Sequence, residues 1–148
     1  MAVQRYYLDT SLLMAALVHE PGTAEACRFL QHTEHQLWQI STWVETELAS
    51  ALAMQCRRGV ITPPERDQAW SRYQTMRDQR LQVLGLEAVD FALAARFCLS
   101  DPPPLRAGDA LHLALCQRQN SCLASFDRAL CKAASHHQVA VHQLLVSG

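Results

Sequence analysis

Residues 5–17, which read RYYLDTSLLMAAL, decide the fold class of this 148-residue chain. A short apolar segment from Arg5 to Leu8 is followed by Asp9, and a helical apolar pattern then covers residues 11–18. The same order of strand and helix recurs at 37–58 and at 122–135. Strands that alternate with helices indicate a parallel sheet covered by helices on both faces. We therefore predict an α/β fold.

The remaining elements follow from apolar periodicity and from start and stop signals. Thr62-Pro63-Pro64-Glu65 is typical of a helix start, and Thr42 with Glu45 has the spacing of a capping box. Residues 101–104, which read DPPP, predict a surface loop. In sum we predict strands at 5–8, 37–40, 81–84, 122–124 and 139–142, and helices at 11–18, 23–32, 42–58, from 62 onward, 88–99, 108–117 and 127–135.

The bulk properties favour one cytoplasmic domain over residues 1–148. Apolar residues make up 49% of the chain, and the net charge of −1 gives no whole-molecule attraction to nucleic acid. No apolar run reaches the roughly 20 residues that span a bilayer, and the N-terminus lacks the pattern of a secretion signal. We therefore expect no membrane partner.

Cysteine and arginine have unusual distributions in this sequence. The six cysteines form no Cys-x-x-Cys pair and no zinc spacing, so we expect buried small hydrophobic side chains in a reducing compartment.

Twelve of the thirteen basic residues are arginine, and six of these lie between 57 and 80. That run fits either a basic face or the solvated surface of a helix, and the sequence leaves both open.

Four carboxylates occupy positions where a parallel sheet gathers ligands, beyond the carboxyl ends of its strands. Asp9 and Asp127 directly follow predicted strands, Asp109 lies in the first turn of a helix, and Glu47 lies in the second turn of another. Carboxylates that converge raise one another's pKa, and a divalent cation removes that cost. Carboxylate oxygens suit Mg²⁺ or Mn²⁺. The sequence therefore predicts a metal site built from these four acids.

Each of these acids also has a structural interpretation. Asp9 and Asp127 stand where they could cap the following helices, and an acid in a first helical turn, such as Asp109, interacts favourably with the helix dipole. Glu45 competes with Glu47 for the site, but the capping box gives Glu45 a structural role, while Glu47 borders the buried stripe of its helix. Joint placement at strand ends favours the metal site.

His112 follows Asp109 by one helical turn, so the two side chains could touch, and a role as general base has to be weighed. Its neighbours Leu111 and Leu113 favour a packed or surface-facing histidine instead. We therefore leave it outside the predicted site.

Four segments resemble the PIN domain family: YLDTS at 7–11, ELA at 47–49, LRAGDALHLA at 105–114 and LASFD at 123–127. Their order and intervals are most similar to the VapC-type toxins of bacterial toxin–antitoxin pairs. The resemblance covers essentially the whole chain, and the segment around Asp109 is the most specific. In one departure, Arg128 and Ala129 stand where many members carry a further acid or Asn close after Asp127, which leaves open how many metals bind.

The resemblance implies a three-layer α/β/α domain with a central parallel sheet of four to five strands. It also implies a Mg²⁺- or Mn²⁺-dependent endoribonuclease, a homodimer, and a cognate VapB-type antitoxin that blocks the site. Arg106, just before the Asp109 helix, is a candidate contact for RNA phosphate. The positions that match the family are the metal-binding and catalytic acids Asp9, Glu47, Asp109 and Asp127 and the supporting residues Ser11 and Ser125.

Two other functions compete with the ribonuclease. A catalytically inactive PIN-like domain would bind an antitoxin or act as a scaffold, and the four intact acids argue against it. A phosphoacceptor domain or haloacid-dehalogenase-type phosphatase also places Asp at strand ends. The phosphatase needs Asp-x-Asp where this chain has Asp9-Thr10-Ser11, and the only lysine, Lys132, lies in a predicted helix rather than after the last strands.

Overall fold

A computed structural model describes residues 2–100 and 103–147 and confirms the α/β class. Its sheet has five strands, all parallel, in the order β3-β2-β1-β4-β5. The strand bounds are β1 Arg5–Leu8, β2 Leu37–Ser41, β3 Leu81–Leu84, β4 Cys122–Ser125 and β5 Val141–Gln143.

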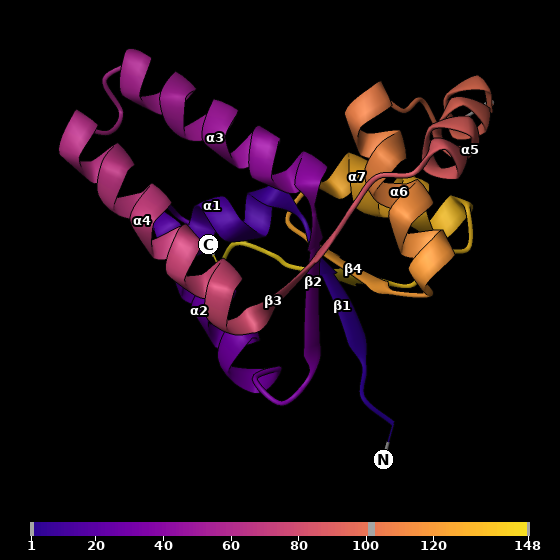
Figure 1. Ribbon diagram of the computed structural model, residues 1–148, viewed down its shortest axis with the longest axis horizontal. Coiled ribbons are helices and arrows are strands. Elements are labelled where there is room, and N and C mark those ends of the chain that lie inside the picture. Colours follow the sequence, from indigo (N-terminus) through magenta and orange to yellow (C-terminus); the bar gives the residue numbers. More distant parts are fainter. Residues whose placement is uncertain (1, 101–102, 148) are drawn as a thin grey trace.

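Seven helices connect and cover these strands within the described residues (Figure 1). Helices α1–α4 gather on one side of the sheet, and α5–α7 gather on the other. The helix bounds are α1 Thr10–Leu17, α2 Thr23–His32, α3 Thr42–Arg57, α4 Pro63–Arg80, α5 Ala88–Leu99, α6 Ala107–Gln119 and α7 Arg128–His136.

The strand order explains this division of the helices. The chain moves outward from β1 to β2 and β3, and then returns across the sheet to β4 and β5. Because crossover connections between parallel strands are right-handed, reversing the direction of travel places the later helices on the opposite face. The direction switches between β1 and β4, and the carboxyl ends of strands at such a switch are where open α/β sheets bind ligands.

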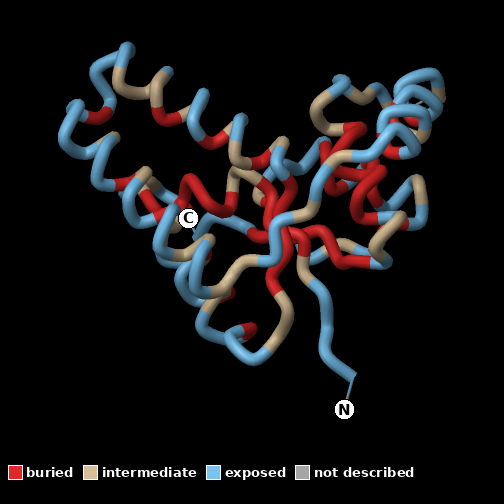
Figure 2. The backbone as a smooth tube through the Cα atoms, viewed as in Figure 1, coloured by how far each residue is buried: buried red, intermediate tan, exposed pale blue. Residues whose placement is uncertain are grey.

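The core is centred on the two middle strands. Tyr7 and Leu8 of β1 are fully buried, and every residue of β4 is buried. Figure 2 shows buried segments concentrated along the central strands and on the helix faces that pack against them. The position that ends β1, Asp9, is thus fixed by the best-packed part of the molecule.

Several local predictions need correction. Ser41, not Thr42, caps α3 by accepting from the Val44 N–H, while Glu45 instead accepts from the Tyr73 hydroxyl and pairs with Arg77. The predicted capping box at Thr62 is confirmed. The last strand begins at Val141 rather than at residue 139.

The cysteine prediction holds for only half of the set, because Cys116, Cys122 and Cys131 are buried whereas Cys27 and Cys98 are exposed. Residues 101 and 102 of the predicted loop lie outside the described residues. No helix in the described ranges is both long and apolar enough to cross a membrane.

Candidate active site

A cavity of about 490 Å³ opens beyond the carboxyl ends of β1 and β4, where the strand order switches direction. All four acids singled out from the sequence line it, although they come from four different parts of the chain. The outer wall is the exposed side of α3. The lining comprises Asp9, Thr10, Ser11, Trp43, Thr46, Glu47, Ser50, Ala51, Met54, Asp109 and Asp127.

Asp9 is fixed at the floor of the cavity. Its backbone N–H donates to the Ala124 carbonyl at 3.0 Å, which continues the pairing of β1 with β4. Its Oδ2 accepts hydrogen bonds from the hydroxyls of Ser11 and Ser125, both at 2.7 Å. The same oxygen also caps α1 through the Ser11 N–H, so the capping interpretation of Asp9 is confirmed. Across the described ranges, no hydrogen bond reaches the other oxygen, Oδ1.

Ser11 and Ser125 connect the Asp9 carboxylate to the loop after β4. The Ser125 hydroxyl accepts from the Asp127 N–H at 2.9 Å, and the Ser11 hydroxyl accepts from the Phe126 N–H at 3.1 Å. The two hydroxyls therefore orient one carboxylate oxygen and fix the backbone that carries Asp127.

Glu47 reaches the cavity from the second turn of α3. Its Oε1 accepts from the Thr10 hydroxyl at 2.7 Å and pairs with Nε2 of His112 at 2.6 Å. Burial alone would raise the pKa of Glu47, but the hydrogen bond and charge of His112 outweigh burial and lower it. No donor from the described segments reaches Oε2, which lies 3.3 Å from the place where a side chain on Gly108 would begin.

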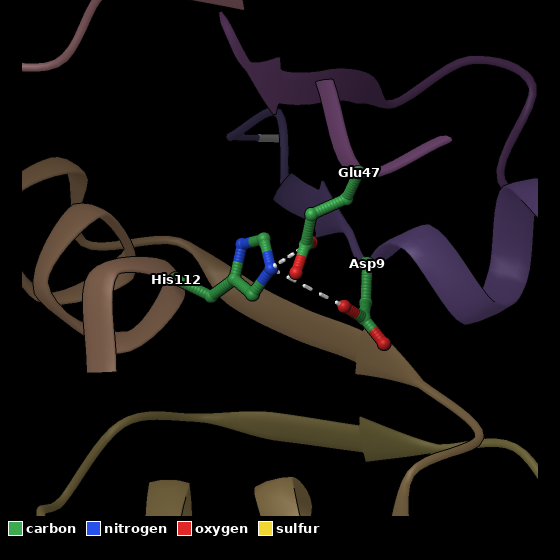
Figure 3. A group of neighbouring side chains, drawn as sticks. All are labelled: Asp9, Glu47 and His112. Carbon is green, nitrogen blue, oxygen red and sulfur yellow. Dashed lines mark hydrogen bonds and ion pairs between the residues drawn. The ribbon is translucent and has the colours of Figure 1, made fainter. Parts of the chain in front are cut away.

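His112 is the residue that sequence reasoning left out. The ring is only 1% exposed, as packing between leucines suggested, yet Figure 3 shows it pointing at Asp9 and Glu47. Its Nε2 lies 3.7 Å from Asp9 Oδ1, and the three residues each offer one ligand atom within 4.8 Å of the others. The one-turn spacing from Asp109 was the available signal, but the hydrogen-bond partner is Glu47 rather than Asp109.

Asp109, in the first turn of α6, and Asp127, at the N-cap of α7, complete the acidic lining. Partial burial raises the pKa of Asp109, and the nearby charge of Asp127 raises it further. Asp127 is exposed, and its Oδ1 accepts from the Leu130 N–H at 3.0 Å, so it also caps α7 as one interpretation of the sequence expected. Arg106 is exposed at the start of α6 and does not line the cavity.

The arginine run at 57–80 is partly used inside the molecule. Arg80 lies over the Trp38 ring and donates to the Glu34 carbonyl, and Arg77 pairs with Glu45 and Asp78. These contacts match the solvated helix surface better than a free basic face.

The donor set of the cavity fits a divalent cation. Asp9 and Glu47 each keep one oxygen in protein hydrogen bonds and leave the other to the cavity. The Asp109 carboxylate receives no hydrogen bond from residues 2–100 and 103–147. Oxygen-rich, anionic sets of this kind suit Mg²⁺ or Mn²⁺.

A match to the family described as PIN domain covers residues 6–135. The chain belongs to the PIN domain family. Solved structures with the same fold also match this chain. No curated protein matches its sequence.

VapBC2 from Rickettsia felis, bound to a DNA fragment from its promoter, gives a TM-score of 0.70 at 13% identity, covering 96% of this chain and 100% of that chain. VapC20 from Mycobacterium tuberculosis, described as a Sarcin-Ricin loop cleaving toxin, gives 0.71 at 17% identity, covering 86% and 94%. FitAcB from Neisseria gonorrhoeae gives 0.68 at 17% identity, covering 93% and 96%. At these identities the likeness establishes the PIN fold, including its three-layer arrangement.

Proposed function

We propose that this PIN domain is a Mg²⁺- or Mn²⁺-dependent endoribonuclease and the toxin of a toxin–antitoxin pair. The observation that carries the proposal is the convergence of four acids on one cavity at the switch point of the sheet. Two of them, Asp9 and Glu47, each have one oxygen without a hydrogen bond from the described residues. A cation in this cavity would offset negative charge that His112 compensates only in part.

The roles of the acids follow from how each is held. Asp9 and Asp109 would hold the metal directly, with Asp127 as a third ligand, and Glu47 would bind it or orient the attacking water. The serines on Asp9 Oδ2 keep Oδ1 turned to the cavity. When bound, the cation would make a hydroxide available near neutral pH and offset charge on the phosphoryl oxygens.

The reaction is hydrolysis of an RNA phosphodiester bond. The oxygen of water forms a bond to phosphorus, the bond from phosphorus to the 3′ oxygen breaks, and the leaving oxygen takes up a proton. The products are a 3′-hydroxyl and a 5′-phosphate. The four carboxylates that line the cavity would repel the phosphate of the substrate, so a cation is needed for binding as well as for chemistry.

The partners extend the proposal. The similarity of fold to VapBC2, whose structure holds a DNA fragment from its promoter, supports a VapB-type antitoxin as the partner of this chain. We also propose that the chain forms a homodimer. Arg106 is exposed at the N-cap of α6, three residues before Asp109, and is a candidate contact for RNA phosphate. A catalytically inactive domain that only binds an antitoxin remains the second candidate.

The test is incubation of total cellular RNA with the wild type and with Asp9→Asn, in Mn²⁺ or in Mg²⁺, followed by mapping of the cut ends. Discrete cuts are expected for the wild type and not for Asp9→Asn. Asp67→Asn is the matched control, because Asp67 is exposed on α4 and does not line the cavity.

Equal cleavage by the wild type and Asp9→Asn would defeat the catalytic assignment. Absence of both cleavage and Mn²⁺ binding in the wild type would favour the antitoxin-binding role.

A further inference from the structure

A buried chain of hydrogen bonds runs from the sheet into the cavity. Ser41 Oγ lies 2.8 Å from the Tyr7 hydroxyl, which lies 2.7 Å from His112 Nδ1, and Nε2 of that ring lies 2.6 Å from Glu47 Oε1. Ser41 and Tyr7 are fully buried, and Glu47 is the first member with substantial exposure. Figure 3 shows the ring entering the site from α6 on the side opposite the backbone of Asp9.

The direction of these hydrogen bonds can be assigned from the chemistry of the groups. The Glu47 carboxylate can only accept, so Nε2 of His112 must carry a proton. In the neutral ring Nδ1 then accepts from the Tyr7 hydroxyl, and the Tyr7 oxygen accepts from Ser41. Ser41 Oγ in turn accepts from the Val44 N–H. If the ring is doubly protonated, the Nε2–H bond to Glu47 is unchanged.

This series of hydrogen bonds determines which oxygen of Glu47 reaches the cavity. Thr10 on α1 and His112 on α6 both occupy Oε1, so Oε2 is left free. A Glu side chain held by one hydroxyl alone would keep more of its rotamer freedom. A second donor on a rigid, buried ring removes that freedom, as outer partners do for metal ligands.

We propose that His112 is a positioning residue that orients Glu47 through its Nε2 proton, and that Tyr7 holds the ring in place at Nδ1. In this assignment His112 does not ligate the metal, because Nε2 is protonated and directed at Glu47. The kinetic part of the inference rests on the proposed ribonuclease function, whereas the part about hydrogen bonding in the metal-free protein does not.

The first experiment uses metal-free protein and needs no activity. Nuclear magnetic resonance of protein with ¹⁵N-labelled histidine should show His112 with a proton on Nε2. In Glu47→Gln the amide still offers an oxygen acceptor, so the Nε2 proton signal should shift but persist. A ring protonated only on Nδ1, with Nε2 free to bind a metal, would overturn the proposal.

The second experiment compares two amide substitutions. In His112→Gln the side-chain nitrogen can reach the former place of Nε2 and donate to Glu47, whereas in His112→Asn it reaches only the place of Nδ1. We expect His112→Asn to lower kcat or Mn²⁺ affinity by about tenfold to a hundredfold, with KM for RNA nearly unchanged. His112→Gln should recover most of that loss. Equal behaviour of the two variants would contradict a positioning role.

Variants that leave the ring in place guard against failure to fold. Tyr7→Phe removes only the hydroxyl that holds Nδ1 of the ring, and Thr10→Val removes the other donor to Oε1 at a partly exposed position. In Tyr7→Phe the proton should stay on Nε2, because the Glu47 carboxylate still accepts it, and Thr10→Val should weaken Mn²⁺ binding more when combined with Tyr7→Phe than alone. A ring without a proton on Nε2 in Tyr7→Phe, or strictly independent effects, would contradict the proposal.

Different results would overturn the proposed ribonuclease function and the proposed role of His112. A wild type that cuts no RNA removes the ribonuclease, yet the ring tautomer and the order of Mn²⁺ affinities would still test the role of His112. A wild type that cuts RNA, with Gln and Asn variants that are indistinguishable, removes only the role of His112.

Discussion

The cavity has two unlike pairs of acids. We call Asp9 and Glu47 the anchored pair, because one oxygen of each is held by two side-chain donors. We call Asp109 and Asp127 the rim pair. The carboxylate of Asp109 has no hydrogen bond from the described residues, and Asp127 uses one oxygen to cap α7. Burial and the nearby charge of Asp127 raise the pKa of Asp109, while His112 lowers that of Glu47 against the effect of burial.

This contrast separates two requirements of a metal site. The anchored pair supplies geometry that exists before any ligand arrives, because its donors come from buried elements. The rim pair supplies negative charge that the folded protein tolerates poorly without a counter-ion. Substitutions in the anchored pair should therefore affect function most, whereas substitutions in the rim pair should also change the stability of the metal-free protein.

The largest effect is expected when the anchored pair is broken at Asp9. Asp9→Asn keeps an oxygen for the two serines but removes the charge, and it should reduce RNA cleavage by about a thousandfold, since cation catalysis contributes several kcal/mol. Cleavage rates in Mn²⁺ measure this, with circular dichroism to confirm folding. A loss of less than tenfold would show that Asp9 is not central.

Asp90 lies outside the cavity and is paired with the positively charged Arg118, so it serves as a comparison for the four cavity acids. Its buried carboxylate receives two hydrogen bonds from Arg118, at 2.7 and 2.9 Å. Burial would raise the pKa of Asp90, but Arg118 and the Glu87 N–H outweigh burial and lower it. Asp90→Asn should cost about 2 kcal/mol of unfolding free energy at pH 7, measured by urea denaturation.

The pH dependence of that loss follows from the lowered pKa. The contribution of Asp90 is present above the unfolded pKa of about 3.9 and is lost as the pH falls through the lower folded value. The difference between wild type and Asp90→Asn should therefore shrink only in strong acid. Asp67→Asn, in an exposed pair, is the control and should change little. A difference that is constant down to pH 2 would contradict this account.

Gly108 tests how tightly the anchored pair is packed. A Cβ there would lie 3.1 Å from Trp43 Nε1 and 3.3 Å from Glu47 Oε2. Gly108→Ala should therefore lower Mn²⁺ affinity several-fold by displacing Glu47, although Ala is the better helix former by about 1 kcal/mol. Gly85→Ala, where a Cβ meets nothing within 4 Å, is the matched control for calorimetry. Unchanged affinity in Gly108→Ala would show that Glu47 has room to move.

The smallest effect is expected in the rim pair of the metal-free protein. Because the folded pKa of Asp109 is raised, its contribution to stability is present below the unfolded pKa and is lost as the pH rises through the folded value. Asp109→Asn should therefore raise the Tm slightly at pH 7 and not at pH 3. Added Mn²⁺ should stabilise the wild type more than the variant. A lower Tm for metal-free Asp109→Asn at pH 7 would contradict the destabilisation of the Asp109 carboxylate by burial and by the charge of Asp127.

The sequence predicted those parts of the site that depend on local pattern. Asp9 and Asp127 were placed by the strands that precede them, and Glu47 was preferred to Glu45 by helical geometry, a choice the cavity lining matches. His112 was missed because its two partners lie 65 and 105 residues away in the chain. No periodicity reports such contacts.

The wrong predictions about the cap of α3 and the burial of Cys98 have a similar origin. Thr42 and Glu45 fit a capping box locally, but Ser41 ends a buried strand and its hydroxyl is already positioned to cap α3. Cys98 lies between apolar neighbours, yet its place on the outer face of α5 leaves it exposed. Burial depends on which face of an element meets the rest of the chain, and tertiary packing decides that.

An anomalous difference map from crystals of the wild type soaked in Mn²⁺ tests the proposed metal site most directly. The proposed site requires a peak in the cavity within direct coordination distance of Asp9 Oδ1 and of an Asp109 carboxylate oxygen, and no such peak in Asp9→Asn. A map without a peak in this cavity, or with Mn²⁺ bound away from Asp9 and Asp109, would contradict it.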